Sequence, residues 1–223
     1  MDTSVKRWVG YGGLAFFVLV VAAVFMAPNT PSTNATAAKV ESYYHQYHNI
    51  SLVSSYVIVL AVIVGLPYFW YVREYLGRIE ANRRLLTVAF SGAIVFAVSG
   101  LVGAGAKFAL ADASHAGNIT GASMQSLNVL QNSLNVPLTA AGAASFLIVT
   151  GLAVIRNGGL PRWLGWVAMA FGVISASGVV GPIGVGLWIL ATSITVIVRG
   201  SASPTNHDVI HQAGAASPTP ADR

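Results

Sequence analysis

The chain has 223 residues, of which 55% are hydrophobic and 9% are charged, and its mean hydropathy is +0.67. Soluble domains carry roughly 25% charged residues, so this composition excludes an ordinary soluble protein and indicates one that lies in a bilayer. The net charge of +5 would suit nucleic acid if it covered one soluble face. The basic residues instead lie at the ends of apolar segments, and we predict no nucleic-acid partner. Cysteine is absent, which excludes disulfides, thiolate metal sites and thiol catalysis.

Apolar segments of membrane-crossing length recur along the whole chain. A helix needs roughly 20 residues to cross about 30 Å of hydrocarbon, and the segments that come near this length are 8–27, 50–72, 85–106, 136–155, 163–180 and 183–198. The sequence therefore predicts an all-α fold, a polytopic transmembrane helix bundle of six spans in a single membrane domain, residues 1–199. Residues 200–223 are rich in Ser, Ala, Pro and Thr and are predicted to form a disordered cytoplasmic tail.

The first two spans differ in how they begin and end. Lys6 and Arg7 precede the first span in the basic-then-apolar order of a signal peptide, but the apolar run is longer than the ~7–15 residues typical of one. We therefore favour a retained helix over a cleaved one. The second span contains Pro67, which predicts a kink in its last turns.

The third span is rich in small residues, among them Gly92, Gly100 and Gly103, which let membrane helices approach closely. We expect this span to be central in the bundle and to pack against the fourth. Residues 107–135 are predicted to form an outer loop, with a weakly amphipathic segment at 124–134 on the membrane surface. The fourth span is expected to begin at Pro137, because a first helical turn does not need the missing N–H.

The basic residues predict which way the spans face. If both termini lie on one side, ten of the twelve Lys and Arg residues lie on that side, and only Lys39 and Lys107 lie opposite. Cytoplasmic segments carry the excess of basic residues, so both termini are predicted to be cytoplasmic in a multi-pass protein of the cell membrane. Within this pattern the charged stretch 73–84 is the main topological anchor.

Several features resemble a large, mostly actinobacterial family of small multi-pass membrane proteins of unassigned function. These features are Tyr43, Tyr44 and His48 before the second span, the stretch 159–166 with Pro161, Trp163 and Trp166, and Leu187 with Trp188 in the last span. The resemblance covers about residues 41–199. It implies a bacterial six-helix membrane bundle and assigns no catalytic residue.

Asp, Glu, Lys, Arg and His are absent from all six predicted spans. Inside membranes such residues mark proton relays and paths for charged substrates, so their absence argues against a proton-coupled pump. It leaves open a path for a neutral or lipidic molecule.

One dense cluster of ligand-type side chains lies in the predicted outer loops. Glu41, His45 and His48 would share one face of a helix, and Asp112 and His115 would pair three residues apart. Imidazoles with a carboxylate suit zinc or another divalent ion, and an open position at such a site would suit hydrolysis. We favour the alternative, an interfacial collar of Tyr and His with Glu41 in solvent and no metal, and we predict no cofactor.

Other motifs carry less information. His207 and His211 resemble a His-Glu-x-x-His zinc motif with Asp208 in place of Glu, but they lie in the Pro- and Ser-rich tail instead of on a packed helix, so we treat the match as chance. The sequence has no P-loop, dinucleotide-binding loop or serine-nucleophile elbow, so nucleotide binding and serine hydrolysis have no support.

The sequence alone favours a non-enzymatic integral membrane protein that interacts with membrane lipid, with another membrane protein or with itself. The first alternative is a facilitator or permease for a small neutral or hydrophobic molecule. The second is an extracytoplasmic metal-dependent hydrolase that uses His45, His48 and His115.

Overall fold

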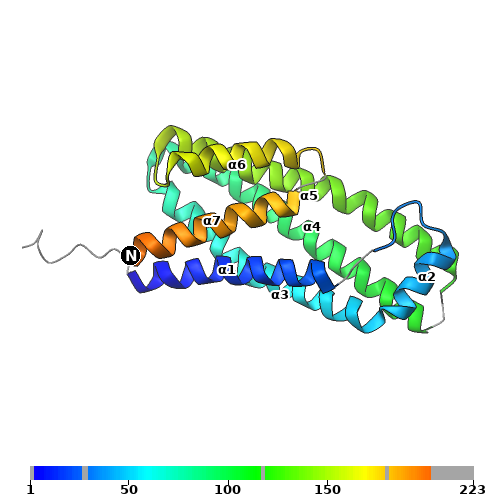
Figure 1. The fold of residues 1–223 in the computed structure, drawn as a ribbon. Helices are drawn as coiled ribbons and strands as arrows, with labels where there is room; N and C mark the ends of the chain where they lie inside the picture. Colours follow the sequence, from blue (N-terminus) through cyan, green and yellow to red (C-terminus); the bar gives the residue numbers. More distant parts are fainter. Residues whose placement is uncertain (1–2, 27–29, 117–118, 179–180, 202–223) are drawn as a thin grey trace, which may run out of the picture.

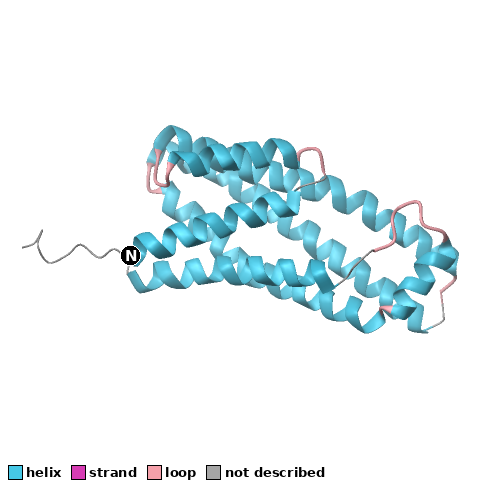
Figure 2. Cartoon of the chain, viewed as in Figure 1, coloured by secondary structure: helices cyan, strands magenta, loops and turns pink. Residues whose placement is uncertain are grey.

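The computed structural model describes residues 3–26, 30–116, 119–178 and 181–201, and all regular structure in these ranges is helical (Figures 1 and 2). The elements in chain order are α1 (Thr3–Met26), α2 (Ala37–Gln46), α3 (His48–Gly77), η1 (Glu80–Asn82), α4 (Arg83–Ala116), α5 (Gly121–Asn157), α6 (Arg162–Ser175) and α7 (Gly181–Ser201). The all-α prediction is confirmed. The predicted tail beyond Ser201, with its zinc-like His motif, lies outside the described residues.

Four helices in the described ranges, α1, α3, α4 and α5, are long and apolar enough to cross a membrane, and α6 and α7 are shorter apolar helices. A multi-pass membrane bundle therefore agrees with the structure. The fifth predicted span, 163–180, is longer than α6, which ends at Ser175 before a turn in which Gly178 has φ 81°. The 14 residues of α6 extend roughly 21 Å, less than the thickness of a hydrocarbon core. The number of crossings stays a prediction.

The predicted outer loop 107–135 is wrong, because α4 continues to Ala116 and α5 begins at Gly121. No Gly or Pro interrupts residues 107–116, and Thr120 caps α5 by accepting a hydrogen bond from Ser123 N at 3.3 Å. Pro137 accordingly lies deep inside α5 and not in its first turn, and α3 likewise continues past Pro67. The α4–α5 hairpin reaches beyond α1, α6 and α7 at the end of the bundle that carries α2 (Figure 1). We call this end the outer end and the end at the α3–α4 turn the inner end, after the predicted orientation.

The outer end is a small helical cap. Tyr44 of α2 is fully buried with Leu110 of α4 and Met124 of α5. The connection that precedes α2 is tied to α5, since Gln125 donates to Ala35 O at 3.0 Å and Asn128 donates to Ser32 O at 3.2 Å. The polar face of the first half of α5 therefore binds this connection. The segment 124–134 is part of α5 and not a separate helix, and its place on the membrane surface stays a prediction.

Backbone contacts without intervening side chains join the long helices. A Cβ placed on Gly92 of α4 would lie 2.7 Å from Phe146 N, and one on Gly142 of α5 would overlap the backbone of Phe96. Gly151 of α5 and Gly165 of α6 meet in the same way, with a Cβ on either lying 2.6–2.9 Å from the carbonyl oxygen of the other. The predicted small-residue packing of the third and fourth spans is thus confirmed.

The inner half of the bundle has a closed aromatic core. The ring centroids of Phe16 and Phe69 lie 5.7 Å apart, those of Phe69 and Phe146 5.1 Å, and those of Phe146 and Trp188 5.3 Å, all edge to face. The indole of Trp188 donates to Leu164 O at 3.3 Å. This row connects α1, α3, α5 and α7 across the bundle, so these helices pack without a channel between them at this level.

The charged stretch 73–84 forms the turn from α3 to α4. Asn82 is fully buried there, donates to Leu76 O at 3.4 Å and accepts a hydrogen bond from the amide of Asn157. Arg73 lies over the Trp70 ring, 4.8 Å from its centroid, and pairs with Glu74 at 3.2 Å. The buried Asn82 side chain therefore holds the turn in place, and the side chains of Arg73 and Glu74 lie beside it.

Replacing Gly142 with Ala is expected to lower stability by about 1–3 kcal/mol, because a methyl group there must displace the backbone of α4. The measurement is the thermal unfolding midpoint of the purified protein in detergent. Gly105→Ala is the matched control, since nothing lies within 4 Å of a Cβ at Gly105. Equal midpoints for the two variants would contradict the close contact.

The predicted orientation can be tested with single cysteines, because the chain has none of its own. Ala81 in η1 and Ala122 in the first turn of α5 are both exposed, at opposite ends of the bundle. In intact cells a membrane-impermeant maleimide is expected to label Ala122→Cys, and to label Ala81→Cys only after permeabilisation. The reverse pattern would overturn the orientation.

Candidate functional site

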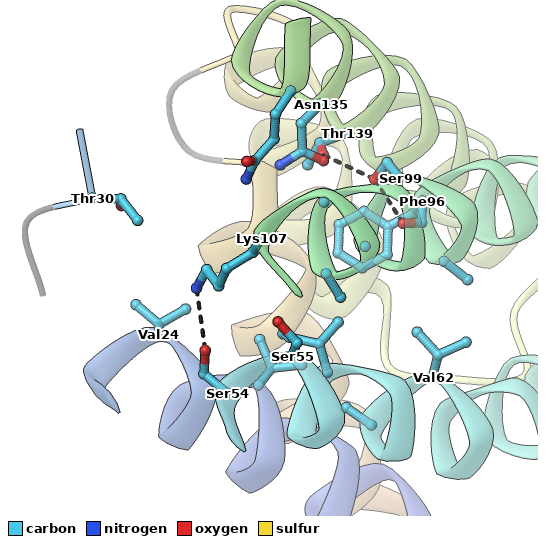
Figure 3. Close-up of a pocket in the computed structure, with 18 of the residues that line it drawn as sticks. Val24, Thr30, Ser54, Ser55, Val62, Phe96, Ser99, Lys107, Asn135 and Thr139 are labelled. Atoms are coloured by element: carbon cyan, nitrogen blue, oxygen red, sulfur yellow. Dashed lines mark hydrogen bonds between the residues drawn. The ribbon is translucent and has the colours of Figure 1, made fainter. Parts of the chain in front are cut away.

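A cavity of about 290 Å³ lies between α1, α3, α4 and α5, in the outer half of the bundle (Figure 3). The structure makes room for it with small residues: Gly100 and Gly103 of α4 and Ala61 of α3 line its walls. A Cβ on Gly103 would already lie 3.3 Å from the Asn135 amide. Larger side chains at these positions would fill the space.

The outer end of the cavity is polar. Lys107 of α4 reaches across to α3, where its Nζ donates to Ser54 Oγ at 3.3 Å (Figure 3). The remaining polar side chains at this end are Ser55 from α3, Tyr44 from α2, and Asn128, Gln131, Asn132 and Asn135 from α5. These side chains offer hydrogen-bond donors and acceptors together with one ammonium group.

Two of these polar groups have no hydrogen-bond partner. The Tyr44 hydroxyl and the Gln131 Oε1 are both buried and unpaired in the described structure. Burial, and to a lesser extent the neighbouring Tyr43, raises the pKa of the Tyr44 hydroxyl well above its ordinary value, so this group stays protonated as a donor. A buried polar group without a partner is unfavourable, so both groups would gain from a polar ligand.

The inner end of the cavity is apolar. Its lining there comes from Phe16 and Val20 of α1, Val62 and Phe69 of α3, and Phe96 of α4. Phe96 and Lys107 lie roughly 16 Å apart along α4 at about 1.5 Å per residue, which is half of a hydrocarbon core of about 30 Å. The cavity thus has the depth of one leaflet.

The cavity opens sideways because α7 does not reach this level. The turn between α6 and α7 lies beside Val136 of α5, where a Cβ on Gly178 would come within 3.0 Å of it, and α7 begins part-way along the bundle (Figure 1). Over its described residues α1 packs against α3 and α7 and scarcely touches α4 or α5. Val24 lines the cavity and is 62% exposed, so the opening lies between α1 and α5.

Lys107 does not lie in an outer loop beyond the third span, where the sequence predicts it. It lies within α4, half-buried and facing the cavity. The signal that could have found it is the unbroken Ala-rich run from 106 to 116, which continues the helix past the lysine.

The structure brings together the three outer histidines, from α2, α3 and α4. The His48 and His115 rings stack with centroids 4.7 Å apart, and the His45 and His115 centroids are 6.3 Å apart. The His48 Nδ1 lies 2.9 Å from Ala111 O. Since a carbonyl oxygen only accepts, Nδ1 is the donor of this hydrogen bond.

The two carboxylates do not join the histidines. Glu41 lies by the start of α5, where its Oε2 would come within 2.9 Å of a Cβ on Gly121. The helix breaks at Tyr47, which has φ −106°, so the expected single helical face through Glu41, His45 and His48 is wrong. Asp112 is exposed on α4.

Within the described residues no group of three His, Cys, Asp or Glu side chains is placed to hold a metal ion. The near-parallel rings of His48 and His115, 29° apart, are arranged for stacking. Metal binding by Glu41, His45, His48, Asp112 or His115, the alternative that the sequence does not favour, stays a hypothesis.

Comparison with family models, curated proteins and solved structures finds no match. The resemblance drawn from residues 159–166 therefore identifies no family. Any function must be argued from the chain itself.

His48→Ala is expected to lower stability by about 1–2 kcal/mol, because it removes a ring contact and a hydrogen bond between α3 and α4. His115→Ala removes only ring contacts and is expected to cost about half as much. Thermal unfolding in detergent measures both, with the exposed neighbour Asn49→Ala as control. If His48→Ala cost no more than Asn49→Ala, the histidines would not tie the two helices together.

Proposed function

We propose that this protein is a lipid-binding integral membrane protein that holds one single-chain amphiphile in the cavity between α1, α3, α4 and α5. The observation that carries the proposal is the polarity of the cavity, apolar from Phe96 and Phe69 inward and polar around Lys107. A hydrocarbon chain fits the first end and a headgroup fits the second. The depth of one leaflet and the side opening beside Val24 support entry from the bilayer.

The finer topology belongs to the same proposal. Six crossings with both termini cytoplasmic would place the turn 73–84 inside and the cap with α2 outside, in agreement with the distribution of basic residues. From Leu85 to Lys107 α4 rises roughly 33 Å, so Lys107 would lie near the outer hydrocarbon boundary. The ligand would then come from the outer leaflet.

Binding has more support than passage across the membrane. A facilitator or permease needs a route to the inner side, and the cavity ends at the packed row of Phe16, Phe69, Phe146 and Trp188. A metal-dependent hydrolase has less support still, because its histidines stack on one another and no carboxylate joins them.

A phenylalanine at Ala104 tests the cavity. Ala104 lines it and is 5% exposed, so Ala104→Phe is expected to fill the space and abolish binding of one amphiphile per chain. Ala109→Phe, on the exposed face of the same helix, is the matched control. Native mass spectrometry of the purified proteins, with palmitate and monopalmitoylglycerol added after delipidation, measures the stoichiometry.

A second blocking variant helps to separate a filled cavity from misfolding as the cause of lost binding. Ser55→Leu fills the cavity from α3 with a smaller side chain, and circular dichroism checks that each variant keeps its helices. For the wild type, ligand at a hundred times its Kd is expected to add about 2.7 kcal/mol of stability. A wild type without stoichiometric amphiphile, or folded blocking variants that still bind it, would refute the proposal.

A further inference from the structure

We infer that the amphiphile is a single-chain lipid with an anionic headgroup, and that Lys107 is the residue that recognises it. This inference rests on the proposed lipid binding and adds the charge of the ligand to it. It is drawn from the surroundings of Lys107, since the cavity lining in the described part of the chain contains no carboxylate.

The only polar partner of Lys107 in the described structure is Ser54 Oγ, at 3.3 Å. That hydroxyl is itself engaged, since it donates to Ser51 O at 3.1 Å. An ammonium group has three donors, so two remain for a ligand. Lys107 lines the cavity, and Figure 3 shows its amine beside Ser54.

Every element around this ammonium contributes neutral groups. Besides Lys107, the polar residues that line the cavity are Ser54 and Ser55 of α3, Tyr44 of α2, Ser99 of α4, Thr30 of the connection before α2, and Asn128, Gln131, Asn132, Asn135 and Thr139 of α5. Two acidic residues belong to the same end of the bundle, and neither lines the cavity. Asp112 is exposed on α4, and Glu41 lies at the start of α5. The described lining therefore carries one positive charge and no negative one.

A half-buried charge without a counter-ion is unfavourable, and an anion supplied by a ligand would compensate it. The donors around Lys107 suit the oxygens of such an anion, because the unpaired Tyr44 hydroxyl can donate as well. A cationic or zwitterionic headgroup would bring a second positive charge to the lysine. Charge complementarity thus selects a carboxylate or phosphate over choline-type headgroups.

The depth of Lys107 agrees with this assignment. Farther from the cap the cavity is lined by Val62, Phe69 and Phe96, whose side chains offer no polar contact. A single hydrocarbon chain can lie there while its headgroup stays at the level of the lysine. The inferred ligand class is therefore a fatty acid or another monoacyl lipid with an acidic headgroup.

The experiment compares amphiphiles that share a sixteen-carbon chain and carry an anionic, a neutral or a cationic headgroup. Palmitate, neutral monopalmitoylglycerol and cationic hexadecyltrimethylammonium are added to the delipidated protein in non-ionic detergent, and their Kd values are measured by native mass spectrometry and thermal shift. The wild type is expected to prefer palmitate. Lys107→Gln is expected to weaken palmitate binding roughly tenfold to a hundredfold and to leave monopalmitoylglycerol within about threefold.

Lys39→Gln is the matched control, because Lys39 is the other predicted outer lysine, is exposed in α2, and its loss changes the net charge equally. It is expected to keep the preference for palmitate, and Lys107→Arg is expected to restore it. Equal binding of palmitate by wild type and Lys107→Gln would overturn the role of Lys107 and leave lipid binding standing. Failure of every amphiphile to bind the wild type would instead overturn the proposed function.

Discussion

The close backbone contact between α4 and α5 at Gly92 and Gly142 determines the arrangement of the other helices. With no side chains between the two backbones, these helices form a long hairpin whose two ends serve different purposes. Its inner half supports α3, α6 and the aromatic core, and its outer half supports α2 and the connection before it. In a bilayer apolar side chains gain little by leaving lipid for protein, so close van der Waals contact of this kind has to hold the helices together.

The unequal lengths of the helices create the cavity. The α4–α5 hairpin continues outward past the turn at Gly178, whereas α7 begins only there. At the inner level α7 fills the space beside α1 with Trp188. At the outer level no described helix takes the place of α7, and the glycines at 100 and 103 add no side chains to the opposite wall. A packed core and a cavity therefore lie in line within one bundle.

Lys107 of α4 gives the cavity its one charged side chain among the described lining residues. A lysine at this position would be unfavourable against lipid, but its stem lies along the apolar wall of the cavity and its amine reaches the hydroxyl of Ser54. The amides of α5 beside it serve two purposes. Asn128 and Asn132 hold the carbonyl groups of the connection at Pro31 and Ser32, and Gln131 and Asn135 face the cavity. This part of α5 thus holds the connection that lines the cavity at Thr30 and Pro31, and it also supplies polar side chains to the lining.

The sequence by itself determined that the protein is a helical membrane bundle, because its apolar segments and scarce charges fit no other environment, and the glycines of residues 85–106 indicated the central helix pair. Helix ends were harder to predict: polar residues such as Gln125 and Asn128 read as a loop or surface segment until the connection that they bind was in place. The meeting of His45, His48 and His115, the burial of Asn82 and the exposure of Lys107 to a cavity were decided only by the tertiary structure. Each depends on which residues of distant helices lie opposite one another, and spacing along one helix carries no information about that.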